Sequence, residues 1–371
     1  MTAPIDPTHA RLAYELKHTS PLVGVRFDPT GRFLFAGAQD NTVQRFDLVT
    51  GKKTAFVGHK SWVRGIAFSP SRVDRIAPAL VNPAAAVVSS PGFAASNTTR
   101  PFTLFTADYH GKLFWWDGAG DDPTPTRVVE AHDGWVRAVA VSPDGKRVAT
   151  CGNDQRVRVW SATDGKLLHQ FDGHASHVYN VAFHPTEDRL VSADLKGVIK
   201  DWDATTGKPV REFDAKVLHK YDSGFAADIG GARGMAFDAT GQTLACTGIT
   251  NVSNAFAGVG NPLVVLIDWA TGKPKNLTPK DAFQGTGWGI HLHRDGFAVL
   301  GGGGGQGRLW FWKLADSTNV HTVSVPTNVR DMAVHPDGTA LATAGFSGVA
   351  GIYTLTPPPP AAKPPEPKGK K

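Results

Sequence analysis

The chain has 371 residues and a formal charge of +6, and 41 glycines and 26 prolines accompany a hydrophobic content of 41%. This many turn-forming residues excludes a mainly helical protein and suits many short strands joined by turns. No uncharged apolar run approaches the roughly 18 to 20 residues of a membrane-spanning helix, and no apolar core follows a charged start. We therefore expect neither a membrane span nor a signal peptide.

The first ten residues are predicted to form an N-terminal arm, and residues 11–16 then alternate weakly as a strand would. Seven segments with one shared pattern follow, and residues 131–165 show it most clearly. This segment contains His132 after a small residue, an alternating apolar run at 136–141, a Ser-Pro-Asp-Gly turn and two further apolar runs, the last ending in Trp160. Apolar alternation with a period of two between turns predicts short antiparallel strands.

The terminal aromatic residue of this segment recurs along the chain at intervals of 70, 44, 42, 67, 43 and 41 residues. The seven positions are Phe46, Trp116, Trp160, Trp202, Trp269, Trp312 and Tyr353. Two of the intervals are long enough to contain insertions. Cys151 and Cys246 fall on the second strand of different repeats, so we expect two buried free thiols and a reducing, cytoplasmic location.

In this pattern the sequence resembles the WD-repeat β-propeller family, whose repeats of about 40 to 45 residues carry Gly-His and Trp-Asp signatures. Stretches such as GHKSWVRGIAFSP and GHASHVYNVAFHP carry the resemblance. It implies an all-β fold, a propeller of seven four-stranded antiparallel blades over residues 11–355. It also implies that residues 12–16 supply the fourth strand of the last blade and so close the ring.

Three insertions and a tail interrupt or follow the repeats. Residues 71–101 separate the first two strands of the second repeat and are expected either to pack on a neighbouring blade or to dock a partner. Residues 214–231 precede the first strand of the fifth repeat, and residues 249–261 separate its second and third strands, so both are expected as long loops on the top face. Residues 356–371 are rich in Pro and Lys and are predicted to be a disordered tail.

The third repeat contains a set of polar residues that the family links by hydrogen bonds inside a blade: His132, Thr150, Asp154 and Trp160. A His, a hydroxyl and an Asp could also serve as a hydrolase triad. Partial recurrence of the same spacing in other repeats favours the structural interpretation. The position six residues before the terminal aromatic is occupied by His110 in the second repeat and Lys196 in the fourth, so these blades are expected to lack the full set.

One group of residues goes beyond the fold. Aligning the first strands of the repeats places Arg64, Arg137, Arg233 and Arg330 at one position, with Gly24, Tyr179 and Trp288 in the other three repeats. Trp62 and Trp135 stand two residues earlier. In the family these positions surround the mouth of the central channel, and Arg and Trp are enriched at binding hot spots. The sequence therefore predicts a partner-binding site for Arg64, Arg137, Arg233, Arg330, Trp62, Trp135, Tyr179 and Trp288. The alternative is that the arginines stack on the tryptophans and close the channel.

Three classes of function remain. The first is a non-catalytic scaffold that binds a protein partner with an acidic segment, requires no cofactor or metal and is monomeric alone. The second is an enzyme acting at the channel mouth, but no zinc-binding spacing occurs. The third is a nucleic-acid-associated adaptor, which ranks last because the propeller itself carries little net charge. The repeats match the shared pattern about equally well, and the loops are rich in Pro and Arg. Both features favour a bacterial source.

Overall fold

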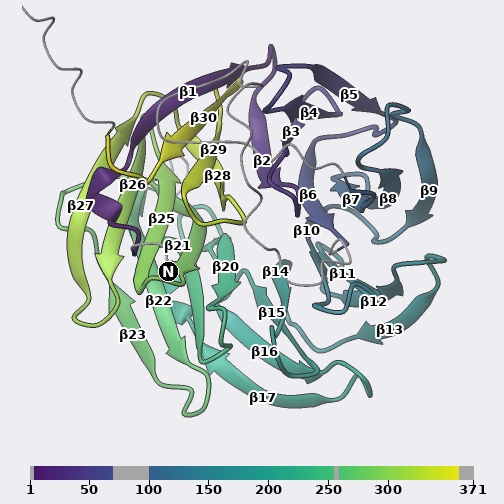
Figure 1. Cartoon of the computed structure of the whole chain (residues 1–371). Helices are drawn as coiled ribbons and strands as arrows, with labels where there is room; N and C mark the ends of the chain where they lie inside the picture. The colour runs from purple at the N-terminus through teal and green to yellow at the C-terminus, as the bar shows by residue number, and fades with distance from the viewer. Residues whose placement is uncertain (1–3, 70–99, 255–258, 359–371) are drawn as a thin grey trace, which may run out of the picture.

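The computed structural model describes residues 4–69, 100–254 and 259–358. Seven four-stranded antiparallel sheets surround a central axis like the blades of a propeller (Figure 1). This arrangement confirms the predicted all-β, seven-bladed fold. The insertion at 71–101 lies almost entirely outside the described residues, as does most of the tail at 356–371.

Each blade runs from an inner strand beside the axis to an outer strand at the rim. The first four blades comprise β2 (Leu22–Phe27), β3 (Phe33–Ala38), β4 (Thr42–Asp47) and β5 (Lys53–Val57); β6 (Val63–Phe68), β7 (Thr103–Asp108), β8 (Lys112–Asp117) and β9 (Pro125–Glu130); β10 (Val136–Val141), β11 (Arg147–Gly152), β12 (Val157–Ser161) and β13 (Leu167–Phe171); and β14 (Val178–Phe183), β15 (Arg189–Asp194), β16 (Val198–Asp203) and β17 (Pro209–Asp214).

The remaining three blades comprise β20 (Gly234–Phe237), β21 (Thr243–Asn254), β22 (Val259–Asp268) and β23 (Pro274–Leu277); β24 (Thr286–His293), β25 (Phe297–Gly303), β26 (Gly307–Lys313) and β27 (Thr318–Val325); and β28 (Val329–Val334), β29 (Ala340–Gly345), β30 (Val349–Thr354) and β1 (Arg11–Lys17). We define the top face as the face on which the inner strands begin.

The third blade shows why these residues form strands of this length. β11 is buried along almost its whole length because neighbouring blades cover both of its faces, whereas the outer strand β13 is largely exposed. The turn between β10 and β11 is fixed by Ser142, whose hydroxyl donates a hydrogen bond to Asp144 at 2.6 Å, and by Gly145, which takes a φ of 72°. Such a positive φ favours glycine, so the sequence favours a turn here between the two strands.

The N-terminal strand closes the ring. β1 pairs antiparallel with β30, from Arg11 opposite Thr354 to Lys17 opposite Val349, and Figure 1 shows it at the rim of the seventh blade. The predicted closure is therefore confirmed. Before it, the arm forms a short 3-10 helix, η1 (Pro7–His9), and the amide of Ile5 donates a hydrogen bond to Asp295.

The His-centred network occurs in the second, third and fourth blades. In the third, His132 contacts Asp154 at 2.8 Å and Thr150 at 2.8 Å, and the indole of Trp160 donates to Thr150 at 2.9 Å. Burial alone would raise the pKa of Asp154, but hydrogen bonds from His132 and Arg158 hold that pKa well below its usual value. The residues thus stabilise a turn.

The second and fourth blades correct the expectation that His110 and Lys196 leave the network incomplete. Asp108 accepts a hydrogen bond from His59, and Asp194 makes the same contact with His174. These carboxylates come from the last residue of the second strand, two positions earlier than the alignment assumed. The third blade has Gly152 there, because an added Cβ would lie 2.8 Å from the ring of His132.

The elaborations of the fifth blade take regular structure. Residues 214–231 contain a second 3-10 helix, η2 (Lys216–Leu218), and a hairpin of β18 (His219–Asp222) and β19 (Ala227–Gly230). Lys196 lies exposed and anchors this hairpin through Asp228, at 3.6 Å. The segment at 249–261, expected as a loop, instead lengthens β21 and β22, whose pairing continues to Thr250 opposite Asn261.

Candidate functional site

In six blades the inner strand contains a β-bulge near its first residue. The side chain of the bulge residue points toward the channel mouth. In the second blade, Val63 pairs with Asp108 and Gly65 with Ala107, so Arg64 between them has no partner in the register. An extra residue of this kind is turned away from the regular alternation of a strand. The bulge residues are Val23, Arg64, Arg137, Tyr179, Trp288 and Arg330.

The first and fifth blades differ from the other five at this position. The bulge residue of the first blade is Val23, so the alignment that placed Gly24 at this position was wrong by one residue. In the fifth blade, Arg233 directly precedes β20, and its amide donates a hydrogen bond to the carbonyl of Thr247 at 2.7 Å. Arg233 therefore occupies the corresponding position without being part of a bulge.

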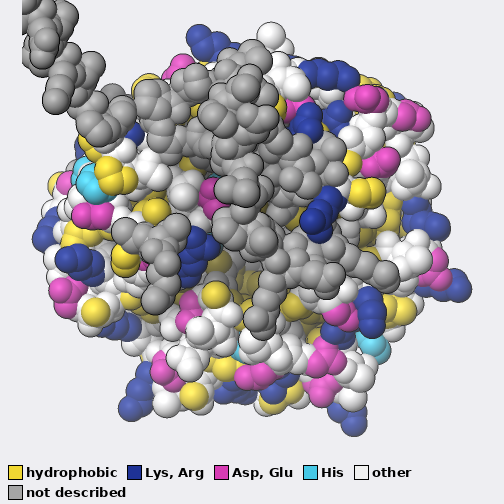
Figure 2. Space-filling view, in the orientation of Figure 1, with side chains coloured by type: hydrophobic (Ala, Val, Ile, Leu, Met, Phe, Trp, Pro, Cys, Tyr) yellow, Lys and Arg dark blue, Asp and Glu magenta, His cyan; other side chains and the backbone are white. Residues whose placement is uncertain are grey.

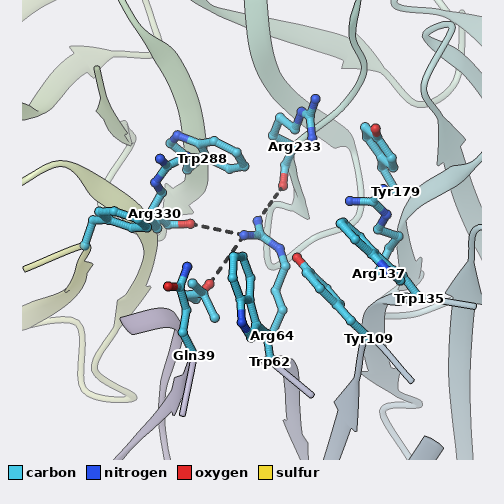
Figure 3. Close-up of a pocket in the computed structure, with 12 residues that line it drawn as sticks. Gln39, Trp62, Arg64, Tyr109, Trp135, Arg137, Tyr179, Arg233, Trp288 and Arg330 are labelled. Carbon is cyan, nitrogen blue, oxygen red and sulfur yellow. Dashed lines mark hydrogen bonds between the residues drawn. The ribbon is translucent and has the colours of Figure 1, made fainter. Parts of the chain in front are cut away.

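These residues line one cavity of about 320 Å³ at the channel mouth on the top face (Figure 3). All eight side chains predicted for partner binding contribute to it. Among the residues that the structure describes, the lining consists of Val23, Gln39, Trp62, Arg64, Tyr109, Trp135, Arg137, Tyr179, Arg233, Trp288, Arg330 and Phe346.

Sequence reasoning missed Gln39, Tyr109 and Phe346, which come from a second position of the repeat. Each follows the second strand of its blade directly, and its amide bonds to a carbonyl just before the inner strand. Tyr109, for example, donates to Trp62 at 3.1 Å, and Phe346 donates to Asn328 at 3.0 Å. The residue after the second strand lines the cavity in the first, second and seventh blades, whereas Asn153 and Leu195 at the same position of the third and fourth blades do not.

Aromatic and guanidinium groups form a continuous stack around most of the mouth. In order, it contains Trp62, Tyr109, Trp135, Arg137, Tyr179, Arg233, Trp288, Arg330 and Phe346. The closest ring pair is Tyr109 and Trp135, whose planes are parallel within 2° at a centroid distance of 4.2 Å. The stack is interrupted at the first blade, where Val23 and Gln39 line the cavity.

The guanidinium groups hold defined positions in this stack. Arg137 lies 4.4 Å from the ring of Trp135 and 4.5 Å from that of Tyr179, and its Nε donates to Asn153 at 2.7 Å. Arg233 lies 4.4 Å from Tyr179. Guanidinium planes stack readily on aromatic faces while keeping their N–H groups at the edge for other acceptors.

Arg64 crosses the mouth. Its guanidinium donates long hydrogen bonds of 3.3–3.4 Å to the carbonyls of Val23, Arg330 and Arg233, which belong to three other blades (Figure 3). Below it, a second cavity of about 230 Å³ follows the axis, and Arg64, Arg137 and Arg233 line both spaces. Arg64 therefore forms part of the floor between the mouth and the channel.

No carboxylate of the described residues neutralises the four arginines of the mouth. Across residues 4–69, 100–254 and 259–358, no carboxylate lies within 4.0 Å of the guanidinium of Arg64, Arg137, Arg233 or Arg330. Burial and the neighbouring arginines lower the pKa of Arg330; burial also lowers the pKa of Arg233. Arginine nevertheless keeps its charge in proteins. On the face in Figure 2, by contrast, basic and acidic side chains are interspersed around the rim.

Two buried donors in the cavity wall have no hydrogen-bond partner among the residues that the structure describes. They are Nε1 of Trp288 and Nε of Arg330. An unpaired buried donor costs about 1–3 kcal/mol, so the wall gains stability when an acceptor reaches it. The mouth is therefore suited to an anion with hydrogen-bond acceptors, held between aromatic faces.

Comparison with known proteins gives one family. The family model "WD domain, G-beta repeat" matches residues 11–47, 123–161 and 165–203. Nuclear distribution protein PAC1 of Arthroderma otae is 28% identical over 155 residues, which are 41% of this chain and 31% of that protein. Small ribosomal subunit protein RACK1y of Oryza sativa subsp. japonica is 30% identical over 127 residues, which are 34% of this chain and 29% of that protein.

A third relative, Protein TPR3 of Oryza sativa subsp. japonica, is 26% identical over 182 residues, which are 48% of this chain and 15% of that protein. The matched segments thus span less than a third of each of these three relatives. Their sources are eukaryotic, and the bacterial source stays a prediction. Within the described part of the chain, no helix has the length and apolarity to cross a bilayer.

Proposed function

The chain belongs to the WD-repeat β-propeller family, and on that premise we propose that it is a non-catalytic scaffold that binds an acidic segment of a protein partner in the top-face cavity. Members of this family generally act as protein-interaction scaffolds. We expect this chain to work in the cytoplasm, as a monomer until it meets its partner.

The observation that carries the proposal is a set of four arginines around one aromatic cavity without a carboxylate partner among the described residues. Guanidinium groups bind carboxylates through paired N–H donors, and a carboxylate bound this way gains charge-assisted hydrogen bonds. Several like charges around one opening also focus a positive potential that attracts acidic segments. Arg, Trp and Tyr are the side chains that contribute most energy at protein interfaces.

The test is affinity capture from a lysate of the native host, with elution by poly-L-glutamate and by poly-L-glutamine. The wild-type chain is compared with a variant carrying Arg64→Glu, Arg137→Glu and Arg330→Glu. A matched control carries Arg127→Glu, Lys166→Glu and Arg294→Glu, which reverse three exposed charges outside the cavity lining. Circular dichroism checks that all three proteins fold.

We expect the wild type and the control to capture the same protein, poly-L-glutamate alone to release it, and the triple cavity variant to lose it. Identical captures by the cavity variant contradict the proposal. Capture that disappears after nuclease treatment favours the nucleic-acid-associated role instead, and hydrolysis in a substrate screen that only the cavity variant loses favours an enzyme.

A further inference from the structure

The cavity has two chemically different halves, and the first is centred on Trp288. Three guanidinium groups surround its indole, those of Arg330 at 4.9 Å, Arg64 at 5.2 Å and Arg233 at 5.4 Å from the ring centroid. Arg137 lies apart from these three, because its ring contacts are with Tyr109, Trp135 and Tyr179 and its Nε donates to Asn153. We call Arg64, Arg233, Arg330 and Trp288 the cationic half.

The second half is an aromatic platform made by Trp62, Tyr109 and Trp135. Tyr109 stacks in parallel on Trp135, and its ring lies 6.0 Å from that of Trp62. Both tryptophans are unusually exposed for their type, at 42% and 41%. Exposed aromatic faces with a fixed orientation contribute contact area at a small cost in conformational entropy.

The geometry points to recognition of a two-part motif, in which the cationic half binds a Glu or Asp side chain of the partner and the aromatic platform stacks an aromatic side chain close to it in the partner's sequence. This inference rests on the proposed function and specifies the partner's chemistry. The two halves line one cavity of about 320 Å³, a volume within the usual range of ligand pockets.

Three observations place the carboxylate at Trp288. Three positive charges gather there without an anion among the described residues, so their mutual repulsion is relieved when an anion enters. The two unpaired buried donors, Trp288 Nε1 and Arg330 Nε, belong to this half. The edge of an indole is also electropositive, which favours an approaching carboxylate oxygen.

Two features place the aromatic side chain on the platform. Trp62 and Trp135 leave apolar ring surface open to a partner, at 42% and 41% exposed, and aromatic pairs gain energy in offset or edge-to-face contact beyond the area that they bury. Arg137 already stacks on Trp135 and continues the platform toward Tyr179. A second carboxylate would meet a single guanidinium group here, that of Arg137, and not a cluster of three.

The test uses an array of acetylated, amidated octapeptides in a Gly-Ser background. One Glu and one Trp are placed in both orders at every separation up to four residues, with Gln-for-Glu and Ala-for-Trp replacements and poly(U) RNA as further probes. The full chain is compared with Arg330→Gln and Trp62→Ala. The matched controls are Arg127→Gln and Leu168→Ala, which alter exposed side chains on the outer strands β9 and β13.

We expect Glu-Trp peptides at a short separation to bind at least tenfold more tightly than either replacement peptide. Arg330→Gln is expected to abolish the preference for Glu over Gln and keep that for Trp over Ala, and Trp62→Ala is expected to do the reverse. Four outcomes overturn the two-part motif. They are a preference for Glu without any for Trp, equal effects of both variants, stronger binding of poly(U) than of the peptides, and no peptide binding at all.

The outcomes also separate this inference from the proposed function. A Glu-only preference with loss of capture by the triple cavity variant leaves the scaffold standing and removes the aromatic part of the motif. Absence of peptide binding together with identical captures removes both. Thermal unfolding of each variant shows whether a loss of binding reflects a loss of folded protein.

Discussion

Thr106 connects the buried network of the second blade. Its hydroxyl lies 2.7 Å from Nε2 of His59 and 2.7 Å from Nε1 of Trp116. Because Asp108 can only accept the hydrogen of Nδ1, Nε2 of His59 is the acceptor and the Thr106 hydroxyl is its donor. Burial lowers the pKa of His59, which keeps the imidazole neutral in this arrangement.

Replacing Thr106 by Val keeps the shape of the side chain and leaves both the indole N–H and the imidazole nitrogen without a partner. We expect the free energy of unfolding to fall by about 3 kcal/mol, since each unsatisfied buried polar group costs about 1–3 kcal/mol. Chemical denaturation measures it. Thr322→Val on the partly exposed outer strand β27 is the control, and an equal effect of both substitutions would contradict the role given to Thr106.

At this scale the sequence predicted the network of His132 but not those of His59 and His174. The spacing rule came from one repeat, in which Gly152 forces the carboxylate to arrive from Asp154. The sequence contains Asp108 and Asp194, but each lies two residues before the position that the spacing rule assigned. A carboxylate at this earlier position can reach the imidazole of its blade only because the second strand ends there. That fact depends on backbone geometry, which a spacing rule does not contain.

β1 is the one outer strand that comes from the far end of the chain. Tyr14 and Leu16 pack on the core between the first and seventh blades, and burial raises the pKa of Tyr14 to about 12. Without β1, the edge of β30 would lie open to pairing with another chain.

Deleting residues 1–17 is therefore expected to lower the midpoint of thermal unfolding and to cause aggregation, and a synthetic peptide of residues 4–19 added in trans is expected to restore both. Light scattering and calorimetry follow the two effects. The same peptide with Leu16→Pro is the control. A truncated chain that is as stable and monodisperse as the full one would show that ring closure contributes nothing to stability.

In the fifth blade the strands are longer than the sequence predicted. Residues 249–261 contain Asn, Ser and Gly in numbers typical of a loop, yet Ile249 and Thr250 continue the pairing of β21 with β22. Neighbouring elements support the extension: Lys220 of the β18–β19 hairpin donates a hydrogen bond to the carbonyl of Val252 at 2.6 Å. A contact between segments some thirty residues apart leaves no periodic signal in the sequence.

For the whole molecule, repetition made the fold predictable. Seven aligned repeats fixed the number of blades, the closure and the eight side chains that now line one cavity. Stacking of the arginines on the tryptophans was the alternative that the sequence left open, and contacts such as that of Arg137 with Trp135 at 4.4 Å show it. The order of the stack could not be predicted because its neighbours belong to different blades, as with Arg137 and Tyr179 at 4.5 Å. The binding role of these residues stays a prediction.

Arg64 links four blades across the mouth, so we expect its removal to affect the whole ring. Arg64→Met keeps the aliphatic stem and removes hydrogen bonds to the carbonyls of Val23, Arg233 and Arg330. Because these bonds are long, we expect the free energy of unfolding to fall by only about 1 kcal/mol. Backbone amides at the start of β2, β20 and β28 should exchange hydrogen faster, while Arg127→Met on the rim leaves them unchanged. If exchange is the same in both variants, the blades hold their positions around the axis without Arg64, and its guanidinium is available to a partner's carboxylate without any loss of rigidity.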